Sequence, residues 1–329
     1  MRRREFITLI SGAAAAWPLG ARAQQPAMKR IGMLIPYEQS DTEAQTQVAA
    51  FLEELQRLGW TDGRNVQVHT RWGDGDGRIG TSVKALVALQ PDVILARSTA
   101  VTAAFLKETR TIPIVFVIVS DPVGDGFVAT MSHPGGNATG FTNVEGSLGS
   151  KWLELLKEIT PSTSHVAVVF GRQTSPGGGS YYLGLIQNTA ASIAVKVTAI
   201  PVQGAAEIEA TINAFAHEPN AALIVTPDLT TSSHRELIVA VAARSRLPAI
   251  YPFPYVVREG GLISYGIDAT DIYRRAATYV DRILRGERPE QLAVQAPVKF
   301  QLAINLKTAK ALGLDVPPTL LARADEVIE

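Results

Sequence analysis

The 329-residue chain contains no cysteine. That absence excludes disulfide bonds, thiol nucleophiles and attachment to a membrane through a lipidated cysteine. An excess of charge of one sign is also missing, because 31 basic residues balance 31 acidic ones. A near-neutral chain has no electrostatic basis for binding nucleic acid or an anionic membrane surface, so neither is an expected partner.

Patterns typical of catalytic and metal sites are absent as well. A glycine-rich stretch at residues 177–180 lacks the lysine of a phosphate-binding loop and is interpreted as a flexible loop. Asp74 and Asp76 resemble the start of a calcium loop, but the twelfth position is Leu86 rather than glutamate, so a turn is expected. No Gly-x-Ser-x-Gly motif occurs, and the five histidines are scattered, at positions 69, 133, 165, 217 and 234. We therefore expect no metal, no cofactor and no enzymatic activity.

The N-terminus has the order of an export signal. Three consecutive arginines at positions 2–4 precede an apolar stretch over residues 6–19, which falls short of the roughly 20 residues of a membrane-spanning helix. Ala21-Arg22-Ala23 then supplies small residues at a cleavage site. We expect a signal peptide cleaved after Ala23 and a mature protein in the periplasm. Residues 3–7 also resemble a twin-arginine motif, so the Tat and Sec export routes both stay open.

The rest of the chain alternates short apolar runs with amphipathic segments, and it does so twice. Continuous apolar strands separated by helices are typical of parallel sheets that helices cover on both faces. Expected strands lie at residues 31–35, 66–68, 93–96 and 114–119, and again at residues 166–170, 195–200, 222–225 and 249–251. Glycine-rich stretches at residues 134–140 and 260–261 are the expected crossings. The predicted fold class is α/β, with two doubly wound parallel-sheet lobes, residues 28–138 and 139–261, and a ligand cleft between them.

Ligands of such sheets bind outside the carboxyl ends of the strands. The strand at residues 93–96 is followed by Ser98, Thr99 and Ala100, which open a helix. The free N–H groups and the dipole of that helix favour an anion such as a ligand carboxylate. A simple helix N-cap is the alternative for the two hydroxyl side chains. Ser120 follows the strand at residues 114–119 in the same way.

Two acidic and three aromatic side chains are further candidates. Asp121 and Asp228, on opposite lobes, are expected either to accept hydrogen bonds from a ligand amine or to stabilise their own turns. Tyr37, Phe253 and Tyr265 are expected to pack on an apolar or aromatic ligand, or else in the core or at the rim.

Several motifs together resemble one known family. The sequence IPIVFVIVSDPVG at residues 112–124 is similar to the central signature of the tryptophan-binding-like family of periplasmic solute-binding proteins, which serve ABC transporters. Agreement continues in PGGNATG (134–140), GLISYGID (261–268), YRRA (273–276), ILRGERP (283–289) and INLKTAKALG (304–313). The resemblance covers essentially all of the mature chain. It implies a type I periplasmic-binding fold, with residues 262–290 added to lobe 1 and residues 291–329 to lobe 2.

The resemblance implies capture of a small carboxylate-bearing solute, such as an amino acid or an aromatic acid, by closure of two lobes. An inner-membrane ABC permease is the implied partner, and we expect a monomer. The carboxylate-binding role falls on Ser98-Thr99-Ala100. On the far lobe, Arg172, Asp228 and Tyr251 are the candidates for ligand-dependent closure, with Arg172 suited to a second acidic group. A ligand sensor for a membrane receptor and an exported enzyme on the same scaffold are the alternatives.

Overall fold

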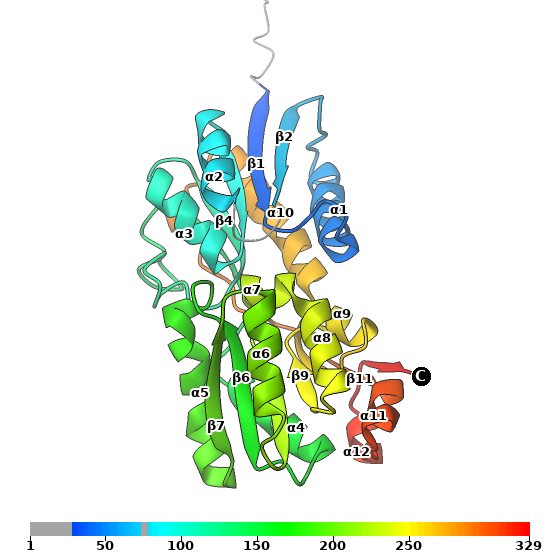
Figure 1. Cartoon of the computed structure of the whole chain (residues 1–329). Helices are drawn as coiled ribbons and strands as arrows, with labels where there is room; N and C mark the ends of the chain where they lie inside the picture. The colour runs from blue at the N-terminus through cyan, green and yellow to red at the C-terminus, as the bar shows by residue number, and fades with distance from the viewer. Residues whose placement is uncertain (1–27, 74–77) are drawn as a thin grey trace, which may run out of the picture.

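The computed structural model describes residues 28–73 and 78–329. The predicted signal peptide and the turn with Asp74 and Asp76 lie outside the described residues. The chain forms two α/β lobes, one above the other in Figure 1. Within the described ranges, no helix combines the length and the apolar character that crossing a bilayer requires.

Lobe 1 is built on a five-stranded parallel sheet in the order β2-β1-β3-β4-β5. Its strands are β1 (Lys29–Ile35), β2 (Val66–Trp72), β3 (Val93–Arg97), β4 (Ile114–Val119) and β5 (Ala138–Thr142). Neighbouring residues of β3 enter different cores: Leu95 lies in the core with α1 (Thr42–Arg57) and α10 (Ala269–Leu284), whereas Ile94 lies in the core with α2 (Ile79–Ala88) and α3 (Thr99–Glu108). Because helices cover both faces, the central strands are apolar at every position rather than at alternate ones.

Lobe 2 is built on a seven-stranded sheet in the order β12-β11-β10-β9-β8-β6-β7. Its strands are β6 (His165–Gly171), β7 (Lys196–Val202), β8 (Ala221–Val225), β9 (Ala249–Tyr251), β10 (Ile263–Ile267), β11 (Phe300–Asn305) and β12 (Glu326–Ile328). Strands β10 and β11 pair antiparallel and the other pairs are parallel. The fold is therefore the predicted pair of doubly wound lobes, with one antiparallel strand pair added in lobe 2.

The helices of lobe 2 also cover both faces of its sheet. One face packs against α4 (Leu148–Ile159) and α5 (Ser180–Ala190), and the other against α6 (Ala205–Phe215) and α8 (Arg235–Arg244). Shorter helices are α7 (Leu229–Ser233), α9 (Pro254–Arg258), α11 (Leu306–Leu312) and α12 (Pro318–Leu321), and the single 3-10 turns are η2 (Pro176–Gly179), η3 (Ala191–Ile193) and η4 (Pro289–Gln291).

The chain passes between the lobes three times, at residues 143–147, at Asp268 and over residues 292–299. Two of these places differ from the predicted lobe boundaries. Residues 138–142 form β5, which pairs with β4 in lobe 1, although residues from 139 onward were expected in lobe 2. Residues 263–267 form β10, which pairs with β9 and β11 in lobe 2, although residues 262–290 were expected in lobe 1. Helix α10 does belong to lobe 1, because it packs on α1 and β4.

The glycines that suggested crossings serve close packing instead. A Cβ atom on Gly140 would lie 2.0 Å from the carbonyl oxygen of Phe116, so glycine is what allows β5 to approach β4. A Cβ atom on Gly261 would lie 2.8 Å from the ring of Tyr251. In sequence, a glycine that lets a linker bend looks the same as a glycine that lets another part of the chain pack closely against it. The two differ only in the residues that surround them in the folded protein.

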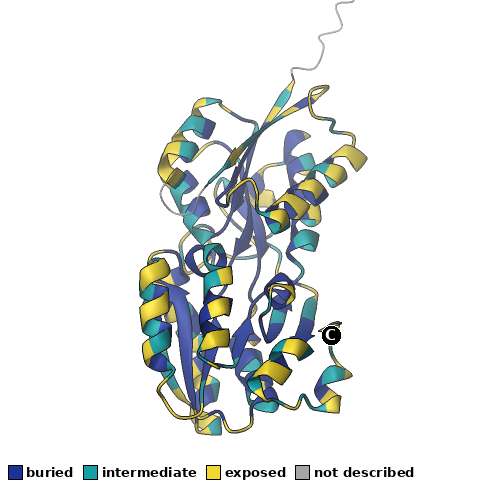
Figure 2. Cartoon of the chain, turned by 45° about the vertical axis from the view of Figure 1, so that its right-hand side comes forward, coloured by how far each residue is buried: buried dark blue, intermediate teal, exposed yellow. Residues whose placement is uncertain are grey.

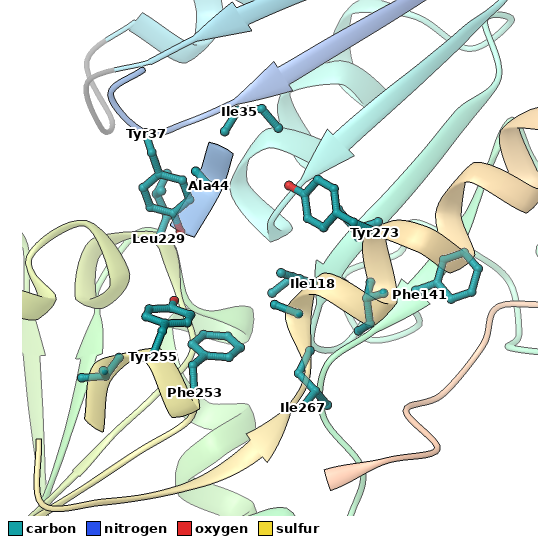
Figure 3. Close-up of a cluster of buried hydrophobic side chains, with 14 of the residues drawn as sticks. Ile35, Tyr37, Ala44, Ile118, Phe141, Leu229, Phe253, Tyr255, Ile267 and Tyr273 are labelled. Carbon is teal, nitrogen blue, oxygen red and sulfur yellow. The ribbon is translucent and has the colours of Figure 1, made fainter. Parts of the chain in front are cut away.

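One apolar cluster continues across both lobes. It joins the α1 and α10 face of lobe 1 to the α6 and α8 face of lobe 2. Figure 2 shows the buried sheets inside each lobe, and Figure 3 shows Tyr37 and Tyr273 of lobe 1 opposite Leu229, Phe253 and Tyr255 of lobe 2. The lobes therefore meet through aromatic and aliphatic side chains.

Candidate ligand site between the lobes

The two lobes meet at the carboxyl ends of both sheets, where sequence analysis placed the site. An open cleft of about 860 Å³ lies along one side of this junction. The loop between β1 and α1, with the first residue of α1, lines it from lobe 1 (Tyr37, Glu38, Ser40, Asp41 and Thr42). The start of α6, helices α7 and α8 and the residue after α9 line it from lobe 2 (Gln203, Gly204, Ala205, Thr230, Ser233, His234, Arg235, Glu236, Leu237 and Glu259). A volume of this size suits a small-molecule ligand.

The start of α3 presents free amide groups at this junction. Ser98 is the N-cap residue, and its Oγ accepts a long hydrogen bond of 3.4 Å from the Val101 N–H. The Ser98 hydroxyl thus caps the helix, which is the alternative that sequence analysis left open for it. Among the described residues, no acceptor is recorded for the N–H groups of Thr99 and Ala100. Those two amides remain available to an anion at the positive end of the helix.

The backbone of Ser98 is strained. Its φ of 82° and ψ of 159° lie in a region that is essentially reserved for glycine. The conformation is held by the Ser98 N–H, which donates to the Val117 carbonyl at 3.0 Å, and by the Ser98 carbonyl, which accepts from Thr102 Oγ1 at 2.8 Å. Strain of this kind is concentrated at binding and catalytic sites, where it directs a loop toward its ligand.

Directly before this turn, the last residue of β3 is a buried arginine. Arg97 is only 2% exposed, and its guanidinium lies 4.2 Å from the centre of the Tyr37 ring. In the part of the chain that the structure describes, its Nε and Nη1 atoms have no hydrogen-bond acceptor. Sequence analysis did not single out this residue, although a charged side chain at the end of a continuously apolar strand was a signal that could have found it.

Ser120 links the lobes rather than facing open space. Its Oγ donates to Asn143 Oδ1 at 3.0 Å and shares a hydrogen bond of 2.5 Å with the Tyr182 hydroxyl of lobe 2. Asn143 is the first residue of the first crossing, so this network ties β4, the crossing and α5 together.

Asp121 adopts the turn alternative, since its Oδ1 accepts from the Gly124 N–H at 2.8 Å. The neighbouring Asp125 is half-buried. Burial raises the pKa of Asp125 to about 6 and the Asp121 charge adds to the rise, while the Gly177 N–H of lobe 2 opposes it. The loop that follows β4 therefore faces the η2 turn of the other lobe through the Asp125 carboxylate.

The hydrogen-bonding capacity of the Asp228 carboxylate is used by neighbouring residues of the protein. The residue is 5% exposed, and its two carboxylate oxygens accept five hydrogen bonds of 2.8–3.1 Å. The donors are the backbone N–H groups of Gly171 and Thr231 and the hydroxyls of Thr174, Ser175 and Thr226. The expected hydrogen bond to a ligand amine is therefore replaced by a structural one, because Asp228 organises the loops after β6 and β8.

Arg172 is not brought into the cleft. Its side chain is 49% exposed and pairs with Glu207 of α6, with Nη2 and Oε1 2.6 Å apart. The loop after β6 turns its arginine outward because the short Thr174 and Ser175 side chains take the inward positions beside Asp228.

The aromatic candidates divide into two groups. Tyr37 and Phe253 lie in the cluster between the lobes, where Phe253 stacks on Tyr255 with ring centres 5.3 Å apart. Tyr251 belongs to the same cluster and is buried beside Gly261. Tyr265 lies away from the interlobe cluster, where it stacks on Phe300 of β11 at 5.5 Å. Tyr255 was missed by sequence analysis because it follows Pro254 in a short helix with no recognisable motif.

An ion-pair network spans the mouth of the cleft. Arg235 Nη1 lies 2.8 Å from Asp41 Oδ2 of lobe 1, and Arg235 Nε contacts both oxygens of Glu259 at 2.9 and 3.0 Å. Burial opposes the charge on Arg235, but its bonds to the two carboxylates outweigh that effect and raise its pKa. In the described part of the chain, no group of three or more metal-ligating side chains is positioned to hold an ion.

Comparison with known proteins agrees with this architecture. A curated tyrosine-binding protein from Clostridioides difficile is 26% identical over 265 residues, which is 80% of this chain and 75% of that protein. A solved conserved domain protein from Vibrio cholerae superposes with a TM-score of 0.85 at 26% identity, covering 91% of this chain and 99% of that one.

Two further structures share the fold at 24% identity, each covering 91% of this chain and 99% of the other. An ABC domain from Streptococcus pneumonia in complex with L-Trp gives a TM-score of 0.84, and a ligand-free, open substrate binding protein from Clostridium difficile gives 0.65. Residues 37–328 match the family described as ABC transporter substrate binding protein. The resemblance seen in the sequence is confirmed, and the chain belongs to this family of ABC transporter substrate-binding proteins, with a type I periplasmic-binding fold.

Proposed function

We propose that this protein is an exported solute-binding component of an ABC importer, which captures a small carboxylate-bearing solute between its lobes and delivers it to a membrane permease. The observation that carries the proposal is that the site is divided between the lobes. Tyr37 and the start of α3 come from lobe 1, whereas Phe253 and Tyr255 come from lobe 2. A site divided in this way is complete only when the lobes close, which is what a binding protein requires to distinguish loaded from empty states.

The chemistry of the junction supports an aromatic amino acid or aromatic acid as the solute. The free Thr99 and Ala100 amides suit a carboxylate at the positive end of α3. The rings of Tyr37 from lobe 1 and Tyr255 from lobe 2 add aromatic surface at the same junction. The curated relative is named for tyrosine and a solved relative holds L-Trp, which supports the same class.

The arrangement of the lobes supports closure as the mechanism. The continuous apolar cluster and the Arg235–Asp41 ion pair both join the lobes. The TM-score is higher against the L-Trp complex than against the ligand-free open structure, 0.84 against 0.65 at the same identity. In this proposal the contacts described here belong to the closed state, and an open state would separate them.

Export follows, in this proposal, from the signal-like order of residues 1–23. We propose that the site binds a solute and carries out no reaction on it. The matched family and the curated relative, which are solute-binding proteins, support this proposal.

A thermal-shift screen of the mature protein against amino acids, aromatic acids, dicarboxylates and neutral sugars tests the proposal. At least one aromatic carboxylate should raise the melting temperature by mass action, and small-angle scattering should show a smaller radius of gyration with that solute than without it. Thr99→Asp should abolish the shift, because it places a like charge where the ligand anion belongs, while Thr99→Ser should retain it. A bound solute with an unchanged radius of gyration would contradict capture by closure.

A further inference from the structure

The buried arginine at the end of β3 has no protein acceptor for most of its hydrogen-bonding capacity. Arg97 is 2% exposed, and neither Nε nor Nη1 is bonded. A buried guanidinium without an acceptor is costly, because it loses its hydration and gains nothing in return. Arginines in protein interiors are therefore normally paired with a carboxylate. Within residues 28–73 and 78–329, no carboxylate pairs with Arg97.

The nearest surroundings of Arg97 are aromatic rather than acidic. Its guanidinium lies over the Tyr37 ring, and Tyr255 and Tyr273 are close enough for their charge states to be coupled to it. Asp41 is the carboxylate near enough to affect Arg97, but Asp41 already binds Arg235 and caps α1 through the Ala44 N–H. The ring faces stabilise the cation only in part, since a cation–π contact is weaker than a buried ion pair.

A second orphaned group lies beside the first. Among the described residues, the buried Tyr273 hydroxyl has no partner of normal hydrogen-bond geometry, and Arg97 is the donor close enough to interact with it. Burial raises the pKa of Tyr273, and the neighbouring Arg97 charge opposes the rise. Figure 3 shows this hydroxyl directed toward the side of the cluster where Tyr37 and Ala44 lie. The Arg97 guanidinium and the Tyr273 hydroxyl thus present unused donors to one place.

The same sheet edge holds the free amides of α3, only two and three residues beyond Arg97. A carboxylate is the ligand group that these donors suit, because a guanidinium donates two parallel hydrogen bonds to its oxygens. Helix amides then add charge-stabilising donors, and the rings of Tyr37 and Tyr255 form walls for an attached aromatic group.

We infer that Arg97 is the carboxylate anchor of the ligand site, assisted by the Tyr273 hydroxyl, and that the ligand is an aromatic carboxylic acid. This inference rests on the proposed solute-binding function and narrows it to one subsite. The anchor comes from lobe 1, so the solute binds lobe 1 through its acid group first, and the aromatic residues of lobe 2 close over its ring.

Truncated probes test the ligand half of the inference on the wild-type mature protein. Calorimetric titration compares L-tyrosine, 3-(4-hydroxyphenyl)propionate, which lacks the amine, and tyramine, which lacks the carboxylate, together with the corresponding tryptophan series. At least one acid should bind, and its decarboxylated counterpart should bind at least about 30-fold more weakly, because the buried guanidinium is then left unpaired. Equal binding of an acid and its decarboxylated counterpart would overturn the inference.

Variants test the residue. Arg97→Met should weaken binding of that acid by at least about 30-fold, and Arg97→Lys should weaken it by about tenfold because lysine keeps the charge without the bidentate geometry. Arg172→Met, a surface arginine paired with Glu207, is the matched control and should bind as the wild type does. Arg97→Met should also melt no lower than the wild type without ligand, since it removes a buried unpaired charge. Wild-type affinity in Arg97→Met would overturn the assignment, and a lowered melting point with normal affinity would make Arg97 structural.

The outcomes separate this inference from the broader function. Binding of neutral or basic solutes alone, with closure in small-angle scattering, would reject the carboxylate anchor and leave solute capture standing. Failure of every solute in the thermal-shift screen would reject both.

Discussion

Arg235 of α8 and Asp41 at the start of α1 form an ion pair across the two lobes, with Nη1 and Oδ2 2.8 Å apart and the side chains only 13% and 12% exposed. Asp41 has a second task, because its Oδ1 caps α1 through the Ala44 N–H at 2.9 Å. One carboxylate thus couples the order of a lobe 1 helix to the position of lobe 2. The pair lies at the mouth of the cleft, where opening of the lobes must break it.

Asp41→Asn should favour the open state. Asparagine caps a helix as well as aspartate does, so α1 stays intact while the charge across the lobes is lost. A partly buried pair of this kind contributes about 1 kcal/mol, which corresponds to roughly a fivefold shift in the closed-to-open ratio. Small-angle scattering of the ligand-free protein should show a larger radius of gyration. Glu209→Gln removes a surface ion pair within lobe 2 and should leave that radius unchanged.

Asp228→Asn should destabilise the fold rather than act on the ligand alone. An amide cannot accept all five hydrogen bonds that the carboxylate accepts, so several buried donors lose their partner. The free energy of unfolding in urea should fall by about 2–4 kcal/mol. Asp268→Asn, which also replaces an N-cap aspartate, should change it by less than about 0.5 kcal/mol. If Asp228→Asn keeps the wild-type free energy of unfolding but loses ligand binding, Asp228 contacts the ligand and its structural role is contradicted.

Ser98→Gly should be more stable than Ser98→Ala. Glycine adopts the observed φ of 82° without strain, whereas alanine keeps the strain and also loses the weak cap on Val101. We expect the two variants to differ by about 1 kcal/mol in the free energy of unfolding. Equal stabilities would show that Ser98 does not hold this backbone conformation in solution.

Asp125 should make stability depend on pH. Its pKa of about 6 lies above the ordinary value of 3.8, so the folded state binds this proton more tightly than the unfolded state does. The resulting stability is fully present below about pH 3.8 and is lost as the pH rises through about 6. Asp125→Asn should therefore raise the melting temperature at pH 7.5 by about 1–3 °C, after discounting for the solvent around this half-buried group. Below pH 3.8 the variant and the wild type should melt alike, because both the folded and the unfolded state then bind the proton. An equal gain at acidic and neutral pH would contradict the titration.

Much of the architecture was predictable because it depends on local composition. Apolar runs such as residues 93–96 in lobe 1 and 166–170 in lobe 2 form strands, since a parallel sheet covered on two faces requires apolar residues at every position. The start of α3 after β3 was predictable for the same reason: Ser98 and Thr99 stand where a strand ends and a helix begins.

Tertiary structure alone decided which side chains face the site. Asp228 and Arg172 both follow strands of the lobe 2 sheet. The Asp228 carboxylate accepts hydrogen bonds from five neighbouring residues, whereas the Arg172 side chain points to solvent. Neither result can be obtained from spacing, because hydrogen-bond partners come from loops far apart in the chain. The predicted crossings between the lobes were misplaced for the same reason. Gly140 and Gly261 allow close packing against residues that only the folded chain brings near them. The burial of Arg97 without a partner likewise exists only once β3, α9 and α10 meet between the lobes, where exclusion of water turns an ordinary charged residue into an unpaired cation.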